Sequence, residues 1–122
     1  MERILVVDDE VEQCNILKKF LSLKGYEVHT ATSGPSAIDK VKGIRPHIVL
    51  LDIRMPEMGG IEVLKEIKKV DPAVGVIMVS GVTDHEEAKK TLELGAYDYI
   101  TKPVDFEYLQ TVLTVKMADL LA

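Results

Sequence analysis

The stretch ILVVDDE, residues 4–10, runs from four apolar residues directly into three acids. A short apolar run bounded by polar residues is typical of a buried strand. Similar runs recur along the chain, at 26–31, 47–53, 74–80 and 97–102. Helical patterns alternate with them, at about 10–24, 34–42, 60–70, 84–94 and 105–121. This alternation predicts βαβ units and an α/β fold with a parallel sheet.

Residues at the ends of the helical patterns support these boundaries. Three glycines each follow a helical pattern and precede a strand, where we expect left-handed helix ends: Gly25, Gly43 and Gly95. A capping box of Thr83 and Glu86 is predicted to open the fourth helix, and Asp105 is predicted to cap the fifth.

The apolar patterns also predict the order of the strands. The first, third and fourth runs are continuously apolar, as expected of strands covered on both faces. The second and fifth alternate polar with apolar residues, which is typical of edge strands. With right-handed crossovers, a simple arrangement is the order 2-1-3-4-5, a doubly wound, flavodoxin-like sheet with five helices. Ligands bind such sheets beyond the carboxyl ends, here between strands 1 and 3.

The composition limits the class of protein. The chain has 122 residues, which suits one domain over 1–122, and a formal net charge of −5. That charge argues against direct contact with nucleic acid or an anionic membrane. We find neither an apolar run near 18 residues nor a signal peptide, and the single cysteine, Cys14, cannot form an internal disulfide. We therefore expect a cytoplasmic protein in which Cys14 is a small core residue.

Polar groups stand at the carboxyl ends of four predicted strands: Asp8 and Asp9, Asp52, Ser80, and Lys102. Clustered carboxylates disfavour one another's charge unless a cation neutralises them. Their oxygen ligands suit Mg²⁺ or Mn²⁺ and not zinc. Asp8 and Asp9 could instead form only a turn and a helix cap.

A divalent ion, an ammonium and a hydroxyl around one carboxylate would stabilise a phosphoryl group. Asp52 would be the nucleophile and would form an acyl phosphate. This chemistry is the hypothesis that the strand ends suggest.

Four segments carry a family resemblance: VVDDE (6–10), LLDIRMPEMGG (50–60), IMVSG (77–81) and GAYDYITKP (95–103). With these segments in this order, the chain resembles a response regulator receiver domain over essentially its whole length. The resemblance implies phosphorylation of Asp52 by a sensor histidine kinase or a histidine phosphotransfer protein. It implies Mg²⁺ binding by Asp8, Asp9, Asp52 and the backbone carbonyl of Arg54, with Asp9 the more direct ligand of the acidic pair.

The resemblance also implies a switch. Ser80 would contact the phosphoryl group, Lys102 would bind it, and Tyr99 would turn inward when Ser80 moves, although Tyr99 could be plain packing. The Lys102–Pro103 peptide bond would be cis. The surface formed by the fourth helix, fifth strand and fifth helix would then change to control an effector or a homodimer.

Two further positions bear on the lifetime of the phosphorylated state. Arg54 and Val82 should flank the path of water to the phosphoryl group, and apolar Val82 cannot orient that water. We expect slow self-dephosphorylation. Arg54 could instead bind the phosphate or point into solvent.

Alternative functions remain open at this level. A small Mg²⁺-dependent phosphohydrolase with an aspartyl-phosphate intermediate would usually carry an acid two residues after the nucleophile, where this chain has Arg54. A flavin carrier would need a phosphate loop after the first strand, where DDE would repel phosphate. The MPEMGGIEVLKEIK segment resembles receivers of enhancer-binding activators. With no DNA-binding segment following, we expect either a stand-alone regulator or a fragment.

Overall fold

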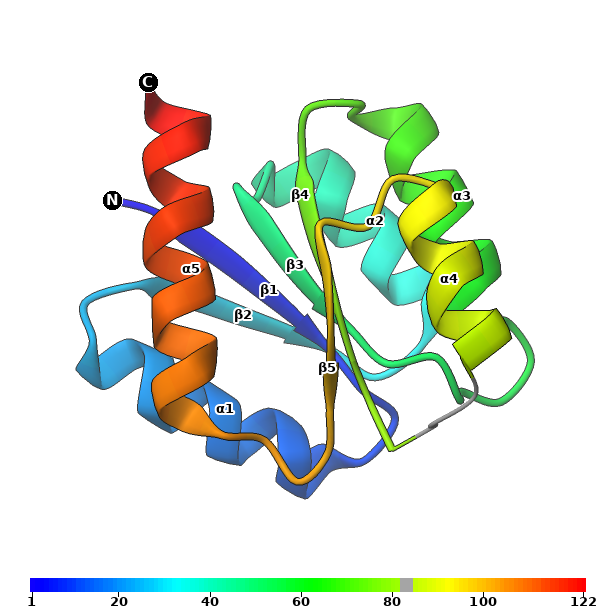
Figure 1. Ribbon diagram of the computed structural model, residues 1–122, viewed down its shortest axis with the longest axis horizontal. Coiled ribbons are helices and arrows are strands. Elements are labelled where there is room, and N and C mark those ends of the chain that lie inside the picture. The colour runs from blue at the N-terminus through cyan, green and yellow to red at the C-terminus, as the bar shows by residue number, and fades with distance from the viewer. Residues whose placement is uncertain (82–84) are drawn as a thin grey trace.

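The computed structural model describes residues 1–81 and 85–122, and Figure 1 shows five parallel strands between helices. The strand order β2-β1-β3-β4-β5 confirms the predicted sheet. The strands are β1 (Arg3–Val7), β2 (Glu27–Ala31), β3 (Ile48–Leu51), β4 (Gly75–Ser80) and β5 (Asp98–Thr101). The helices are α1 (Val11–Leu23), α2 (Gly34–Ile44), α3 (Gly60–Val70), α4 (His85–Glu93) and α5 (Phe106–Leu121).

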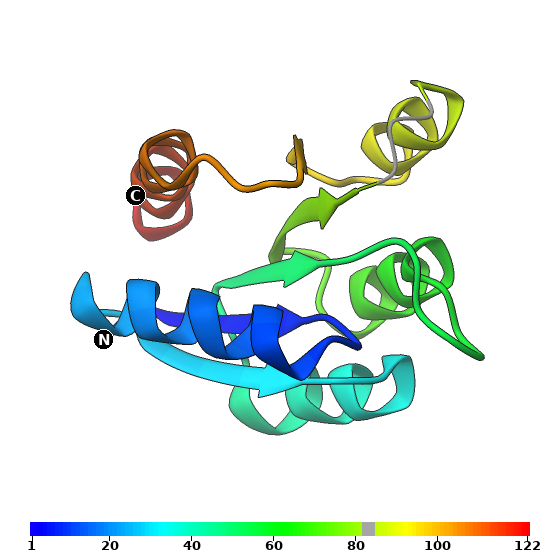
Figure 2. The ribbon, with the colours of Figure 1, turned by 90° about the horizontal axis from the view of Figure 1, so that it is seen from below.

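Helices cover both faces of the sheet and divide the core into two clusters. α1 and α5 lie on one side, and α2, α3 and α4 lie on the other (Figures 1 and 2). Successive side chains of a strand point to opposite faces, so Ile4 and Val6 join the α1/α5 cluster, while Leu5 and Val7 join the α2/α3 cluster. β3 and β4 are buried throughout, which accounts for their continuous apolar runs.

Two of the three predicted glycine ends are confirmed. Gly25 and Gly95 have φ of +95° and +106°, in the left-handed region. The prediction for Gly43 is wrong, because α2 continues to Ile44 and Arg45 adopts φ 55° and ψ 61°.

The residues around Arg45 explain this later helix end. The next residue is Pro46, and a residue before proline is disfavoured in the helical conformation. The Arg3 side chain also donates hydrogen bonds to the carbonyls of Ile44 (3.1 Å) and Arg45 (2.8 Å), which would otherwise lack helical partners. Because Arg3 belongs to β1, the sequence around Gly43 does not indicate this contact.

The start of α5 agrees with the sequence. Asp105 accepts a hydrogen bond from the Tyr108 N–H at 3.1 Å, which confirms the predicted cap. The predicted capping box of α4 involves Thr83, which lies outside the described residues. Within residues 1–81 and 85–122, we find no helix with the length and apolar character that a membrane crossing requires.

The sheet register brings the functional ends of the strands to one edge. Val7 pairs with Leu51, Leu51 with Met78, and Ser80 with Thr101. The residues that follow β1 and β3 are therefore neighbours in space, and the residues that follow β4 and β5 lie further along the same edge. The edge also includes the point between β1 and β3 where the strand order reverses.

Candidate functional site

Three carboxylates meet beyond the ends of β1 and β3. Asp8 and Asp52 directly follow the paired residues Val7 and Leu51, and their exposed fractions are only 3% and 5%. Asp9 is exposed at the rim. One oxygen from each of Asp8, Asp9 and Asp52 lies within 4.8 Å of the others. The sequence prediction that these acids come together is confirmed.

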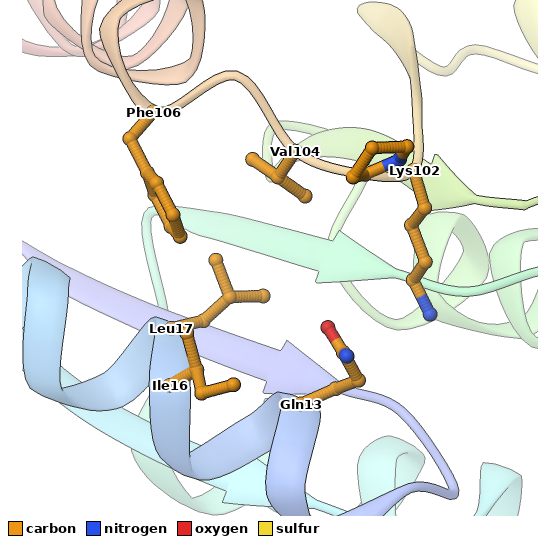
Figure 3. A pocket seen from close by; sticks show the side chains of 7 residues that line it. Gln13, Ile16, Leu17, Lys102, Val104 and Phe106 are labelled. Carbon is orange, nitrogen blue, oxygen red and sulfur yellow. The ribbon is translucent and has the colours of Figure 1, made fainter.

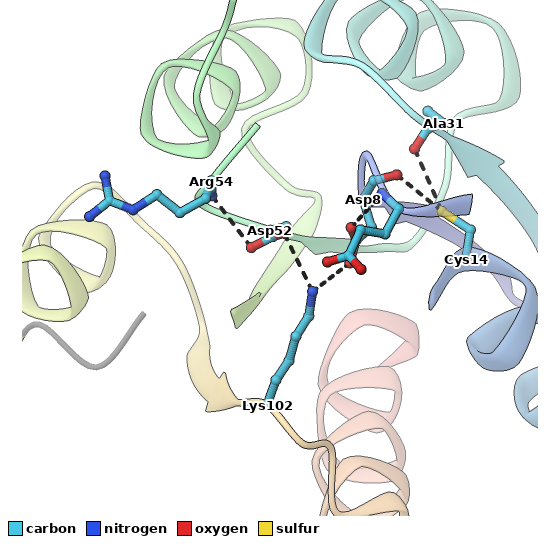
Figure 4. A network of polar contacts seen from close by, with 7 residues as sticks. Asp8, Cys14, Ala31, Asp52, Arg54 and Lys102 are labelled. Carbon is cyan, nitrogen blue, oxygen red and sulfur yellow. Dashed lines mark hydrogen bonds and ion pairs between the residues drawn. The ribbon is translucent and has the colours of Figure 1, made fainter. Parts of the chain in front are cut away.

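Lys102 reaches this cluster from the end of β5 (Figure 4). Its Nζ donates to Asp8 Oδ2 at 2.6 Å and to Asp52 Oδ2 at 3.4 Å. Burial lowers the pKa of Lys102, but the hydrogen bond to Asp8 and the charges of Asp52 and Asp8 outweigh it, so the pKa lies above 10.5. The ammonium is therefore kept charged beside the two buried carboxylates.

Asp8 takes part both in the acidic cluster and in a turn, which the sequence analysis had considered as an alternative. Asp8 Oδ1 accepts from the Glu10 N–H at 2.9 Å, while Oδ2 faces Lys102. The same side chain thus shapes the entry to α1 and contributes charge to the site.

The donor set fits a hard divalent cation. Within residues 1–81 and 85–122, three carboxylates share a single ammonium, so negative charge remains in excess at the cluster. Oxygen ligands partly open to solvent suit Mg²⁺ or Mn²⁺, which retain several water ligands. The three histidines lie elsewhere: His29 pairs with Glu27, His47 accepts from the Arg3 N–H, and His85 is exposed at the start of α4.

Ser80 and Tyr99 adjoin the cluster on the α4 side. Ser80 ends β4 and is fully buried, and its carbonyl accepts from the Lys102 N–H at 2.9 Å. Tyr99 is half-buried and packs against the α2/α3 core cluster. Burial raises the pKa of the Tyr99 phenol, and a hydrogen bond with Ser80 opposes that rise. Ser80 and Tyr99, for which the resemblance implied a joint role, are therefore in contact.

Arg54 lies beside Asp52 but directs its side chain away from it (Figure 4). Its N–H faces Asp52 Oδ1 at 3.4 Å, whereas its Nη2 donates to Glu87 Oε1 of α4 at 3.0 Å. From the sequence we expected the Arg54 side chain to bind the phosphate or to point into solvent. Its ion pair with Glu87 was not predicted, because no local sequence pattern indicates a contact between these two residues. Val82 lies outside the described residues.

Cys14 contacts the backbone of the site. Its Sγ donates to the Asp8 carbonyl at 3.3 Å and lies 3.9 Å from the Ala31 carbonyl (Figure 4). Burial, followed by the charge of Asp8, raises the pKa of the Cys14 thiol. The thiol is a small buried side chain, as expected, and the sequence did not indicate its contact with Asp8. The Lys102–Pro103 peptide bond is cis, as the resemblance implied.

An apolar groove adjoins the cluster (Figure 3). It lies between α1 and the segment after β5, has a volume of about 490 Å³, and shares Lys102 with the acidic site. Ile16 of α1, half exposed, lines it together with Leu17, Val104 and Phe106. The groove therefore borders the acidic cluster at Lys102.

Comparison with known proteins supports one family. Residues 4–114 match the response regulator receiver domain. The transcriptional regulatory protein ZraR of Escherichia coli (strain K12) is 44% identical over 115 residues. That alignment covers 94% of this chain but 26% of ZraR, so the chain spans about a quarter of this relative.

Solved structures agree. The response regulator receiver domain protein (CheY-like) from Methanospirillum hungatei JF-1 has a TM-score of 0.95 and 32% identity, covering 98% of this chain and 96% of that one. The CheX-CheY-BeF3-Mg+2 complex from Borrelia burgdorferi contains a chain with a TM-score of 0.87 and 36% identity. This match covers 93% of the present chain and 88% of that chain.

Proposed function

Because the chain belongs to the response regulator receiver family, we propose that it is the phosphoacceptor of a two-component system, with Asp52 as the phosphorylated residue. The observation that carries the proposal is the position of Lys102, whose ammonium contacts both Asp8 and Asp52 while Asp9 completes the acidic cluster. A carboxylate with a fixed cation at its side is suited to receive an anionic group.

The proposed reaction is a phosphoryl transfer to a carboxylate oxygen. An oxygen of Asp52 attacks phosphorus, the bond from phosphorus to the donor imidazole nitrogen breaks, and its electron pair stays on that nitrogen. Lys102 stabilises the phosphoryl oxygens, and Ser80 donates a hydrogen bond to one of them. Asp8, Asp9, Asp52 and the Arg54 carbonyl would hold Mg²⁺ or Mn²⁺, which supplies charge neutralisation between Asp52 and the incoming group.

The groove beside Lys102 suggests how the donor approaches. Its apolar lining includes the half-exposed side chain of Ile16, and it shares Lys102 with the acidic cluster. We propose that a sensor histidine kinase or histidine phosphotransfer protein docks here, in the cytoplasm. Its phosphohistidine would then face Asp52.

The output surface lies on the other side of Lys102. On phosphorylation of Asp52, the Ser80 side chain would turn toward the phosphoryl group. The Tyr99 phenol, which contacts Ser80 in the unphosphorylated protein, would then change its position. Exposed aromatic and aliphatic side chains mark the adjoining surface of β5 and α5: Tyr97, Tyr108 and Val115. An effector or a second copy of the chain would bind there.

Phosphorylation of the purified protein tests the function. The protein is incubated with acetyl phosphate and Mg²⁺ and weighed intact, alongside Asp52→Asn and the exposed control Asp39→Asn. We expect one phosphoryl adduct in the wild type and in the control, released by hydroxylamine, and none in Asp52→Asn. Turnover of phosphate esters without an adduct would favour the phosphohydrolase and refute the receiver assignment.

Two measurements extend this test. Mg²⁺ should raise the unfolding temperature of the wild type through binding to the native state, and Asp9→Asn should lose most of that rise. The adduct should persist beyond seconds after acetyl phosphate is removed, because Val82 cannot orient water. Decay within seconds would contradict the expected long lifetime.

A further inference from the structure

The ion pair between Arg54 and Glu87 joins the acceptor loop to α4. Arg54 is two residues after Asp52, and Glu87 is in the first turn of α4, 33 positions further along the chain. Their side chains are 67% and 26% exposed. The pair is therefore a contact between the phosphorylation site and an element of the output surface.

The charges of Arg54 and Glu87 also act on Tyr99, the aromatic residue of the proposed switch. After burial and the Ser80 hydrogen bond, the charges that act on the pKa of Tyr99 are those of Glu87, Asp52 and Arg54. The acceptor, the ion pair and the switch aromatic thus form one group. A change of charge at Asp52 acts on every member of it.

We propose that phosphorylation of Asp52 exchanges the partner of Arg54, from Glu87 of α4 to the phosphoryl group, and thereby releases the first turn of α4. This inference rests on the proposed function and adds a second route to the output surface beside Ser80 and Tyr99. Before phosphorylation, Glu87 holds the guanidinium away from Asp52. No covalent bond changes in the exchange.

The relative strengths of the two partners favour the exchange. An exposed ion pair shifts an equilibrium by about 1.4- to 5-fold. A phosphoryl group carries about −1.5 to −2 charges, against one for the carboxylate. It also accepts paired hydrogen bonds from the fork of a guanidinium, and such charge-assisted bonds are stronger than neutral ones. Glu87 is thus a partner that can be displaced.

Hydrogen exchange of α4 tests the proposal in the intact chain. Peptides covering residues 85–93 are followed in the wild type, Glu87→Gln, Arg54→Gln and the double variant, each with and without acetyl phosphate and Mg²⁺. Glu86→Gln is the matched control, since it removes the same charge from the same helical turn. Intact mass reports the fraction phosphorylated in every sample.

We expect Glu87→Gln and Arg54→Gln to speed exchange of unphosphorylated α4 by about 1.4- to 5-fold, with no further effect in the double variant. Phosphorylation should speed α4 exchange in the wild type and in Glu86→Gln, and less in the other variants. Equal effects of Glu87→Gln and Glu86→Gln before phosphorylation would overturn the proposal. An unchanged response to phosphorylation in Arg54→Gln would also overturn it.

A second measurement probes the new partner of Arg54 directly. The ³¹P resonance of the aspartyl phosphate is titrated with pH in the wild type and in Arg54→Gln. A guanidinium at the phosphoryl group favours its fully charged form, so Arg54→Gln should titrate at higher pH, and identical titrations would refute the contact. Absence of the phosphoryl adduct in the wild type would instead refute the proposed function. The ion pair between Arg54 and Glu87 in the unphosphorylated protein would still be tested by hydrogen exchange of α4.

Discussion

Gly60→Ala is expected to destabilise the fold and to displace the backbone of Asp52. Gly60 is the first residue of α3, and its N–H donates to the Ile53 carbonyl at 2.7 Å. A Cβ at this position would lie 2.1 Å from the Asp52 carbonyl oxygen and 2.7 Å from the Ile53 Cα. Both neighbours are backbone atoms of the segment that carries Asp52, so neither can rotate away.

The size of the effect follows from two opposing contributions. Alanine in place of glycine in a helix stabilises by about 1 kcal/mol, whereas overpacking costs about 1–3 kcal/mol. A contact as short as 2.1 Å with backbone calls for the upper end of that range. The net loss is about 2 kcal/mol, or roughly 6–12 °C in unfolding temperature for a chain of this size.

Urea unfolding followed by circular dichroism measures this loss, and Gly43→Ala is the matched control. Gly43 lies in α2 with nothing within 4 Å of an added Cβ, so that variant should gain about 0.5–1 kcal/mol. Because α3 must move away from Asp52, Gly60→Ala should also react more slowly with acetyl phosphate. If Gly60→Ala had the same free energy of unfolding and the same urea dependence as the wild type, the close approach of Gly60 to the backbone of Asp52 and Ile53 would be refuted.

Three further predictions concern single side chains. The raised pKa of Lys102 means that its stabilising contribution is present below pH 10.5 and is lost as the pH rises further. Lys102→Met should therefore be about 3 kcal/mol less stable at neutral pH without Mg²⁺ and show a shallower alkaline decline; parallel pH curves for both proteins would contradict this. Asp105→Ala should cost about 1 kcal/mol in urea unfolding, because the Tyr108 N–H loses its cap, and no loss would show that the cap is unimportant. Cys14 should react with a thiol reagent far more slowly in the folded protein than in urea, since burial and the charge of Asp8 raise its pKa, and equal rates would show that the thiol is accessible.

The sequence predicted the strand ends of the site correctly but not the end of α2. The run of Val6 and Val7 into Asp8, and of Leu51 into Asp52, predicted both the buried strands and their meeting point, because strand ends in a parallel sheet share one edge. The prediction of a helix end at Gly43 was wrong although Pro46 is a local signal for an end at Arg45, and the second contribution to that end, the hydrogen bond from Arg3 to Ile44, comes from 41 positions away. Local propensity carries no information on such a contact.

Apolar periodicity and position at a strand end are local properties of a sequence, and they were enough to predict the strand order and the residues of the acidic cluster. The contacts of Lys102 with Asp8 and Asp52, of α3 with the Asp52 backbone at Gly60, and of Arg54 with Glu87 become apparent only in the folded chain. These contacts join segments far apart in the chain. Their geometry depends on how the helices pack on the sheet, to within an ångström, and no periodicity in the sequence specifies that packing.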